Sequence, residues 1–377
     1  MKFCNMSMRL VNSLMEEKVY WLAWHIILAG QASKFWEIKE RFGSLRDAWQ
    51  APDKEFGFLS SMQGGKASDF LARRSATDLH EVANCLNNKT HKIIFFTDAA
   101  YPEQLRHIFD PPPVLYLRGR EDSLHQVSVA LVGARKASPY GISVAENLAH
   151  DLAAAGVNVV SGMARGIDTA AHRGALAAGG STVAVLGCGV DVVYPRENGK
   201  IMGAIIQSGA VVSEFPPGSQ PEAWHFPVRN RVISGLSRVV VVVEAAEKSG
   251  ALITAHVALE QGRDVMAVPG NITSKTSKGP NALIQQGAAP VLNAADILQE
   301  LGMGTLFPPS GEKEDGSLKL TAEEKLLHEL LDFEPVPLEV LVQKSGLTAG
   351  QAMSALTFLE MKGMVRQMPG RLYARAR

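Results

Sequence analysis

The sequence has no excess of charge of either sign, few cysteines and no long apolar run, and each shortage excludes a class of protein. Its 377 residues carry 38 Lys and Arg against 38 Asp and Glu. The balance also holds locally: residues 1–127 carry 16 basic and 15 acidic side chains, residues 128–300 carry 13 and 13, and residues 301–377 carry 9 and 10. No segment is a polycation, so any nucleic-acid partner must be bound by a local patch.

Cysteine is scarce and dispersed. Cys4, Cys85 and Cys188 form no C-x-x-C pair and no zinc spacing, which argues for a reducing compartment and against a disulfide framework. The most apolar run, Val239 to Val243, is far shorter than the about 20 residues that span a bilayer. The N-terminus also lacks the apolar stretch of a secretory signal. We therefore expect a soluble, cytoplasmic protein with no membrane partner, no metal site and no cofactor.

The remaining composition is that of a globular protein, with 46% apolar and 20% charged residues, and its length favours two or three domains. Residues 16–90 place apolar side chains at three- and four-residue spacing between breaks such as Gly43 and Pro52, so we predict a small helical domain over residues 1–90. A strand-like segment over 92–96 and the rigid Pro111-Pro112-Pro113 follow it.

The segment 91–302 alternates short β-branched runs with stretches of helical length. This alternation predicts a mostly parallel, doubly wound α/β sheet that helices cover on both faces. Ser138-Pro139 is typical of a helix N-terminus, and Gly156 is typical of a helix end. We predict seven strands, over residues 129–132, 157–160, 182–186, 210–213, 239–243, 264–268 and 290–292.

The last part of the chain predicts a separate domain. Residues 303–320 are rich in Gly, Pro and charge and are interpreted as a linker. Within residues 321–377, three helices over 321–332, 337–345 and 348–362 precede a hairpin, which is the outline of a winged helix-turn-helix. Its end carries basic residues without an acid: Lys362, Arg366, Arg371, Arg375 and Arg377. These favour either a wing on DNA or a solvated tail, and a protein contact is the alternative use of the fold.

In an open parallel sheet, ligands bind beyond the carboxyl ends of the strands. The first such loop, which begins at Gly133, offers Arg135 and Lys136 before a helix N-terminus, so it is a candidate phosphate site. The alternative is that Gly133 serves packing alone. The second loop offers Arg165; Asp168 near it is interpreted as a helix cap rather than a catalytic group, and His172 as a packing residue.

The loop before the fifth predicted strand combines aromatic and basic residues. Trp224, His225 and Phe226 directly precede Arg229, Asn230 and Arg231. Bases stack on rings for about 1–3 kcal/mol each while guanidinium groups hold the backbone, so this pattern suits single-stranded nucleic acid. Two alternatives remain open. Phe226 has an equal claim to a place in the core, and two arginines at i and i+2 diverge unless a helix begins beside them.

Two more loops add cations. Lys248 precedes Ser249-Gly250 at a predicted helix N-terminus, and Lys275 and Lys278 lie in the loop after the sixth strand. If the sheet is wound as predicted, all these loops converge on one edge and give a neutral domain a basic pocket. The chain has no Walker A loop, no G-x-S-x-G and no H-E-x-x-H, which argues against an ATPase, a serine hydrolase and a zinc protease.

Six ordered motifs follow one another along the chain: the run from Val132 to Gly141, SGMARGIDTAAH at 161–172, VLGCGVDVVYPREN at 185–198, SEFPPG at 213–218, FPVRNRVISGLS at 226–237 and SGALITAHVALEQGRDVMAVPGN at 249–271. Together they resemble the bacterial DNA-processing protein A (DprA/Smf) family. The resemblance implies an extended Rossmann-like core between a small SAM-like helical domain and a winged helix. One departure is Ala134, where the family often has Ser or Thr.

The resemblance also implies a function. It suggests a non-catalytic, homodimeric protein that binds single-stranded DNA, protects it, and helps to load the RecA recombinase in natural transformation. By the same analogy Arg135 holds phosphate, Phe226, Arg229, Asn230, Arg231 and Lys248 line the DNA groove, and Lys278 lies near it. The alternative is a Rossmann-like nucleotide or nucleoside monophosphate hydrolase, although EAAEKSGAL at 244–252 lacks the glycine pair that such an enzyme would need.

Overall fold

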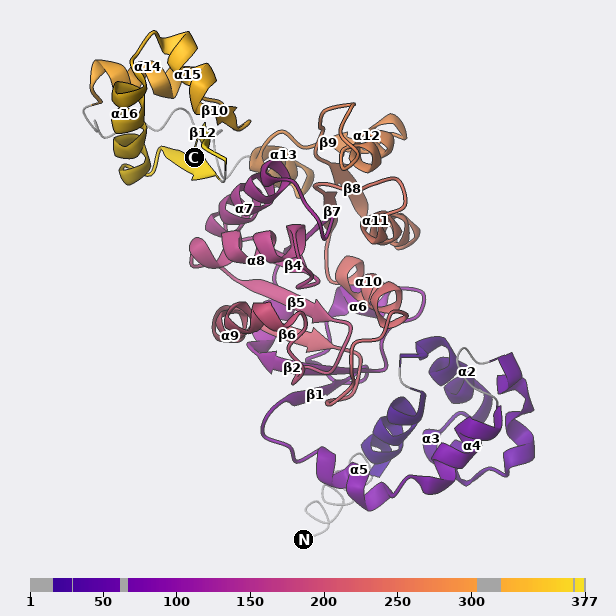
Figure 1. Ribbon diagram of the computed structural model, residues 1–377. Helices are drawn as coiled ribbons and strands as arrows, with labels where there is room; N and C mark the ends of the chain where they lie inside the picture. Colours follow the sequence, from indigo (N-terminus) through magenta and orange to yellow (C-terminus); the bar gives the residue numbers. More distant parts are fainter. Residues whose placement is uncertain (1–15, 29, 62–66, 304–319, 369, 376–377) are drawn as a thin grey trace. The chain divides into compact units, whose positions relative to one another are not determined.

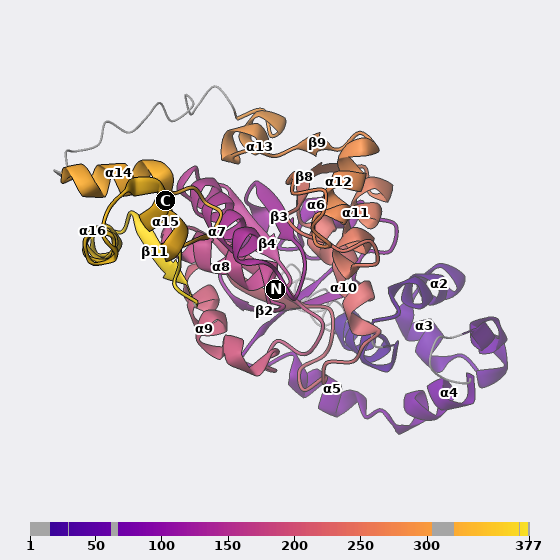
Figure 2. The same cartoon turned by 45° about the horizontal axis from the view of Figure 1, so that its top comes forward.

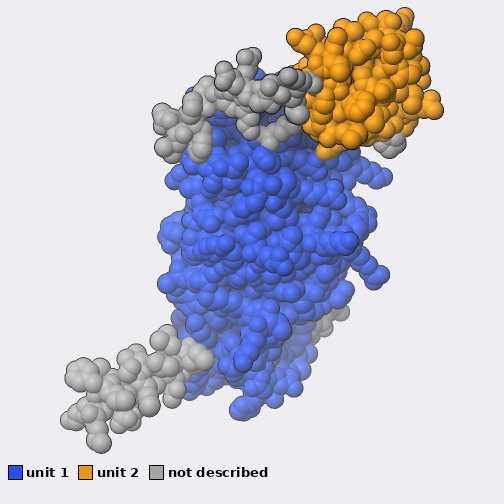
Figure 3. All heavy atoms as spheres, turned by 90° about the vertical axis from the view of Figure 1, so that its left-hand side faces the viewer, with its two compact units in different colours: residues 1–304 blue, residues 305–377 orange. Residues whose placement is uncertain are grey.

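The computed structural model describes residues 16–28, 30–61, 67–303, 320–368 and 370–375. By their contacts they form two compact units, Met1–Gly304 and Thr305–Arg377 (Figure 3). The predicted linker lies outside the described residues except for its two end positions, and Cys4 and Arg377 lie outside them as well. None of the described helices is both long and apolar enough to cross a membrane.

Between residues 16 and 85 the described residues are mostly helical, as their spacing predicts. A helix over residues 16–28 is followed by α2 (Ala32–Phe42), α3 (Leu45–Gln50), a 3-10 helix η1 (Asp53–Ser61), α4 (Ala67–Ala76) and α5 (Leu79–Cys85). Trp24 is the centre of their aromatic core: its ring stacks on Phe70 at 5.6 Å and contacts Trp49 at 5.2 Å. Ser44 caps α3 by accepting a hydrogen bond from the Asp47 N–H.

A nine-stranded sheet follows, in the order β1-β2-β6-β5-β4-β3-β7-β8-β9. Its strands are β1 (Lys92–Phe95), β2 (Val114–Gly119), β3 (Ser128–Val132), β4 (Asn158–Ser161), β5 (Thr182–Leu186), β6 (Ala210–Ser213), β7 (Val239–Val242), β8 (Asp264–Ala267) and β9 (Ala289–Pro290). The seven strands from β3 to β9 pair in parallel, whereas β2 pairs antiparallel with both β1 and β6.

Helices cover both faces of this sheet (Figures 1 and 2). On one face α7 (Pro139–Ala154), α8 (Ile167–Ala177) and α13 (Ala294–Glu300) share a buried cluster with β3, β4 and β7. On the other face α10 (His225–Gly235), α11 (Gly250–Glu260) and α12 (Lys278–Gln285) pack on the strands, with the short α6 (Glu103–Arg106). Helix α9 (Gly199–Ser208) packs beside β6, and η2 (Glu121–His125) and η3 (Arg196–Asn198) are short 3-10 turns. The doubly wound prediction is therefore confirmed.

The second unit has the predicted winged-helix order. It contains α14 (Ala322–Leu330), β10 (Val336–Pro337), α15 (Leu338–Ser345), α16 (Ala349–Met361), β11 (Val365–Met368) and β12 (Leu372–Arg375), with strand order β10-β12-β11. Two of its basic residues already have partners: Lys362 pairs with Glu324 at 2.6 Å, and Arg375 donates to the His328 carbonyl. Part of the predicted basic end therefore forms bonds within its own unit.

The helical segment and the sheet share one buried cluster, and hydrogen bonds join them. The three consecutive prolines serve as acceptors: Trp36 donates to the Pro111 carbonyl, Tyr101 to Pro112 and Trp21 to Pro113, at 2.8 to 2.9 Å. His25 lies 2.8 Å from the Glu214 carbonyl, and burial lowers the pKa of His25 to about 4. The buried imidazole is therefore neutral at pH 7 and takes a proton only with loss of stability.

This pKa predicts acid sensitivity. Between pH 6.5 and 4 the unfolded chain binds a proton at residue 25 that the folded chain does not, so stability falls as the pH falls through this window. We expect wild-type protein to lose about 3 kcal/mol more than His25→Gln between pH 7 and 4. Urea unfolding at several pH values measures the difference, and parallel pH profiles for the two proteins would contradict it.

Candidate nucleic-acid interface

A cavity of about 760 Å³ lies at the carboxyl ends of β3 and β4 and beside β7. Because β3 lies between β4 and β7, the chain leaves the central strands toward opposite sides here, and such a switch point is where doubly wound sheets bind ligands. Of the predicted site residues, the cavity is lined by Gly133, Arg135, Lys136, Phe226, Arg229, Asn230, Ser249 and Gly250. These residues come from three segments that are distant in sequence, the loops after β3 and β7 and the helix α10, which thus converge on one cavity.

Phe226 and Arg135 form the open part of the site. The Phe226 side chain is half-buried, so it is not a core anchor, and the exposed Arg135 guanidinium lies 4.9 Å from the centre of its ring. Tyr194, which is 39% exposed, lies 5.7 Å from the same ring. A cation over an aromatic face beside a second exposed ring combines a phosphate donor with a surface for stacking.

Arg229 borders the same cavity but is buried. Its guanidinium donates to the carbonyls of Gly162, at 2.8 Å, and Val185, which end β4 and β5, and its Nε donates to Asn230. Burial lowers the pKa of Arg229 to about 10, with Asp168 opposing that shift, so it remains charged at pH 7. Arg229 therefore shapes the floor of the cavity by joining two strand ends.

Arg231 lies on the other side of α10, as residues two apart on a helix must. It pairs with the buried Glu214 at 2.7 Å and with Asp110 at 3.0 Å. Burial opposes its charge, but these two carboxylates outweigh burial and raise the pKa of Arg231. The structure thus does not bring Arg231 to the cavity with Arg229, because α10 begins at His225 and both arginines lie beyond its first turn.

Glu244 binds the end of the loop that follows β3. This buried carboxylate accepts hydrogen bonds from the Ser138 N–H at 2.8 Å, the Ser138 hydroxyl at 2.6 Å and Thr276 at 3.1 Å. A Cβ on Gly133 would lie 2.5 Å from the Ile167 side chain, so this glycine is required for packing, the alternative left open by the sequence. Glu244 therefore fixes the start of α7 and, with it, the loop that presents Arg135.

The remaining predicted cations lie around the cavity or away from it. Arg165 lines a smaller neighbouring pocket with Arg135 and Phe226, and it pairs with Glu197. Lys278 pairs with Glu247 at 3.1 Å, while Lys248 is exposed; neither borders the cavity. Of the chain that the structure describes, the basic lining of the cavity thus consists of Arg135, Lys136 and Arg229.

The polar groups next to the cavity have structural partners. Asp168 is not the cap of α8, whose N-cap is Gly166 with no side-chain cap hydrogen bond; it accepts instead from the Ala164 N–H, in the loop before the helix, at 3.3 Å, and burial raises its pKa. His172 is fully buried with Nδ1 2.7 Å from the Thr182 hydroxyl, a packing position, and burial lowers its pKa to about 3. Within the described residues, no group of three or more His, Cys, Asp or Glu is placed to hold a metal ion.

Sequence reasoning missed Tyr194, Glu244 and Asn198. Asn198 donates to the Met163 carbonyl at 2.9 Å and to Thr169 at 2.8 Å, and so supports the loop after β4, where Met163 has a positive φ of 55°. Tyr194 and Asn198 both belong to the quoted run at 185–198, which was the available signal. Glu244 begins the quoted run at 244–252, but nothing local predicts its role, because its partners Ser138 and Thr276 are distant in sequence.

The different burial of the two arginines is testable. Arg229→Ala would leave the strand-end carbonyls and the buried Asp168 without their donor and counter-charge, and should lower the free energy of unfolding by about 3 kcal/mol. Arg135→Ala removes an exposed side chain and should change it by less than about 0.5 kcal/mol. Urea unfolding of both variants measures this, and equal stabilities would contradict the assignment of Arg229 to the floor.

Comparison with known proteins agrees with these motifs. The model of the family described as DNA recombination-mediator protein A matches residues 92–302, and that of the DprA winged helix domain matches residues 311–371. Protein Smf of Escherichia coli is 39% identical over 294 residues, which are 76% of this chain and 78% of that protein. Protein Smf of Synechocystis is 33% identical in an alignment of 393 positions that covers 95% of this chain and 99% of that protein.

Two solved structures are similar as well. The X-ray structure of DNA processing protein A from Streptococcus pneumoniae has a TM-score of 0.62 at 36% identity, covering 76% of this chain and 96% of that one. A structure of DNA processing protein A from Helicobacter pylori, described for its single-stranded DNA binding mode, has a TM-score of 0.51 at 30% identity, covering 55% of this chain and 95% of that one. This chain therefore belongs to the DNA recombination-mediator protein A family (DprA/Smf), as its ordered motifs predict.

Proposed function

We propose that the protein is a single-stranded DNA-binding recombination mediator and that the cavity at β3, β4 and β7 is its DNA site. The observation that carries the proposal is the exposed Arg135 guanidinium 4.9 Å from the Phe226 ring, at the mouth of an open cavity. The described binding of single-stranded DNA by the Helicobacter pylori relative supports the same ligand.

The lining chemistry favours a flexible strand. Arg135 and Lys136 are exposed donors for phosphate, and the N-terminus of α11 at Ser249 and Gly250 adds its positive dipole end. Phe226 and Tyr194 offer ring surface to unstacked bases, which a duplex keeps inside its stack. With so few phosphate contacts, binding should be short-range and sensitive to salt.

We propose that this role is non-catalytic. Asp168, the one carboxylate among the described residues that line the cavity, is buried and bonded to the Ala164 N–H, and Glu244 is fully engaged with Ser138 and Thr276. A nucleotide hydrolase would need one of these groups free to activate water. The proposal extends to the family role: protection of incoming single-stranded DNA in the cytoplasm, and its transfer to the RecA recombinase in natural transformation.

We predict that Arg135→Ala weakens binding of labelled oligo-dT and reduces the slope of log K against log salt by about 0.7, the value for one phosphate contact on a single strand. Fluorescence anisotropy across a salt series measures both quantities. Arg173→Ala is the matched control, because Arg173 is an exposed arginine of α8 that does not line the cavity.

Two outcomes would oppose the proposal. Unchanged oligo-dT binding by folded Arg135→Ala would remove the cavity from the DNA site. Turnover of mononucleotides that Asp168→Asn abolishes would favour the hydrolase instead. RecA filament assembly on a strand bound by wild-type protein, followed by energy transfer between labelled ends, tests the mediator role separately from DNA binding.

We further propose that the homodimer forms at the β9 end of the sheet. β9 is the last strand in the order, so its outer edge has no partner strand among the described residues. Leu292, which is 76% exposed, follows β9, and Leu259, which is 55% exposed, lines a hollow along β8 and β9. A two-fold contact would bury the same apolar residues of both subunits.

Leu292→Asp should therefore yield monomers, because it places two carboxylates in a desolvated two-fold contact. Light scattering at matched concentrations measures the mass. Phe109→Asp, at a residue that is 98% exposed in a different segment, is the control and should leave the mass unchanged. A monomeric wild-type protein, or a Leu292→Asp variant that stays dimeric, would contradict this placement.

A further inference from the structure

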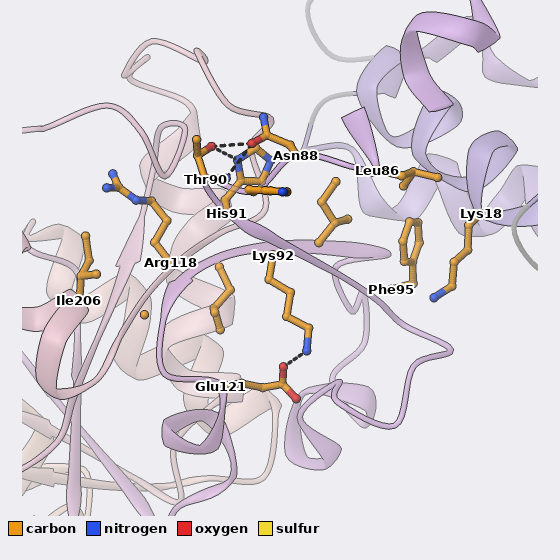
Figure 4. A pocket seen from close by; sticks show the side chains of 14 residues that line it. Lys18, Leu86, Asn88, Thr90, His91, Lys92, Phe95, Arg118, Glu121 and Ile206 are labelled. Carbon is orange, nitrogen blue, oxygen red and sulfur yellow. Dashed lines mark hydrogen bonds and ion pairs between the residues drawn. The ribbon is translucent and has the colours of Figure 1, made fainter. Parts of the chain in front are cut away.

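A second cavity, of about 650 Å³, lies at the β1 edge of the sheet, opposite to the β9 edge, and has no part in the proposed DNA site (Figure 4). It follows β1 from Thr90, His91 and Lys92 at the start of the strand to Phe95 at its end. Leu117, Arg118 and Gly119 of β2 and Ile206 of α9 form the other wall. In the sheet order β1 is five strand steps from β3, or about 24 Å at the usual spacing of about 4.8 Å.

The cavity is basic although the chain is neutral. Four cations line it, Lys18, Lys89, Lys92 and Arg118, against one carboxylate among the described lining residues, Glu121. Figure 4 shows Lys18 and Arg118 at opposite ends, with Lys92 between them and paired with Glu121. Lys18 pairs with Asp98 at 2.7 Å. Lys89 and Arg118 form no ion pair with a described residue, so no carboxylate neutralises either charge, although the Arg118 guanidinium donates to the Val190 carbonyl at 3.3 Å.

The edge of the sheet adds backbone groups to this charge. The Phe96 N–H donates to the Pro113 carbonyl, so in this antiparallel register the even-numbered residues of β1 bond to β2. The N–H and C=O of Ile93 therefore face the open edge. Phe95 also faces it, but its N–H and C=O are taken by Asp98. Lysine on an unpaired edge strand opposes pairing with an uncharged strand from another chain. The same lysines would favour pairing with a strand that carries carboxylates.

The lining favours a peptide over nucleic acid. Phe95 is buried with Lys18 over its ring, and the half-buried His91 ring packs edge-on to Tyr116 at 5.8 Å, so neither ring is open to a base. Leu86, Ile93 and Ile206 instead provide aliphatic surface, which suits apolar side chains. An extended acidic peptide binds where it finds a strand edge to pair with, aliphatic surface for its apolar side chains and cations for its carboxylates. This cavity has all three.

We propose that this groove binds an extended peptide segment of a partner protein, one that pairs with the edge of β1 and carries carboxylates alternating with aliphatic side chains. In such a strand successive side chains point to opposite faces of the sheet. Carboxylates on one face meet Lys92. On the other face, aliphatic groups pack on Ile93 and Ile206 and a carboxylate meets Arg118. Lys89, before the start of β1, meets a carboxylate at the end of the segment. A four-residue strand is about 13 Å long, so a short segment is enough to occupy the groove.

The probe is a fluorescein-labelled nonapeptide that alternates Asp with Ile, titrated with the full chain and followed by anisotropy. The wild-type protein should bind it, and binding should weaken with salt. Exchange of every Asp for Lys should abolish binding. N-methylation of alternate backbone nitrogens should weaken it at least tenfold, because it removes strand pairing and keeps the charges.

The protein variants locate the peptide. Lys89→Glu combined with Arg118→Glu should weaken peptide binding at least tenfold, whereas Arg173→Glu combined with Lys200→Glu makes the same charge change at exposed positions outside the groove and should not. Lys89→Glu alone serves if loss of the bond from Arg118 to the Val190 carbonyl unfolds the double variant. Oligo-dT binding should be the same in all of these proteins.

Three results would overturn the proposal. The first is no binding of the acidic peptide by folded wild-type protein. The second is binding that the groove variants leave unchanged, or that N-methylation does not affect. The third is displacement of the peptide by oligo-dT together with weaker oligo-dT binding in the groove variants, which would make the groove a second nucleic-acid contact.

Discussion

The buried pair between Arg231 and Glu214 is the interaction on which the arrangement of the site depends. Both side chains are almost completely inaccessible, and they lie 2.7 Å apart. Removal of one partner would leave an uncompensated charge in the core, at a cost of about 3–5 kcal/mol. The pair therefore fixes the rotation of α10 about its axis. Since Arg231 must face Glu214, Arg229 and Phe226 must face the cavity.

The same constraint accounts for the charge pattern of the proposed DNA site in a neutral chain. Several of its cations near the sheet have a carboxylate or carbonyl partner: Arg231, Arg165 and Lys278 are in ion pairs, and Arg229 holds two strand ends. The exposed charge left at the cavity comes from Arg135 and Lys136 on a loop that Glu244 fixes. A small, rigid patch makes few phosphate contacts, and few contacts permit release of the strand. That property suits the role proposed above, in which the protein passes its strand to another protein.

The sequence predicted the elements well, and it predicted less well which way their side chains point. All seven predicted strands exist because continuous β-branched runs between helices admit few other folds. β2 was missed because three prolines precede it and obscure its apolar run. The topology alone was enough to predict that the loops after β3 and β7 meet helix α10 at one edge of the sheet. The fate of Arg231 was not, since its partners are Asp110 and Glu214, both outside the local segment. The sequence around Arg231 contains no acidic residue that would have predicted these ion pairs, because the fold brings both carboxylates from distant segments.

The two cavities of the first unit differ in chemistry rather than in charge. Both are basic, but Phe226 and Tyr194 present ring surface at the first, whereas in the second the Phe95 ring is covered by Lys18 and the exposed feature is the backbone of Ile93. Cations beside rings select a ligand with phosphates and flat bases, and cations beside an open strand edge select one with carboxylates and a peptide backbone. Because β1 and β3 are separated by four intervening strands, the two proposed ligands would have room to bind at once. A mediator that holds DNA in one cavity and a protein segment in the other would bring its two partners together on a single rigid sheet.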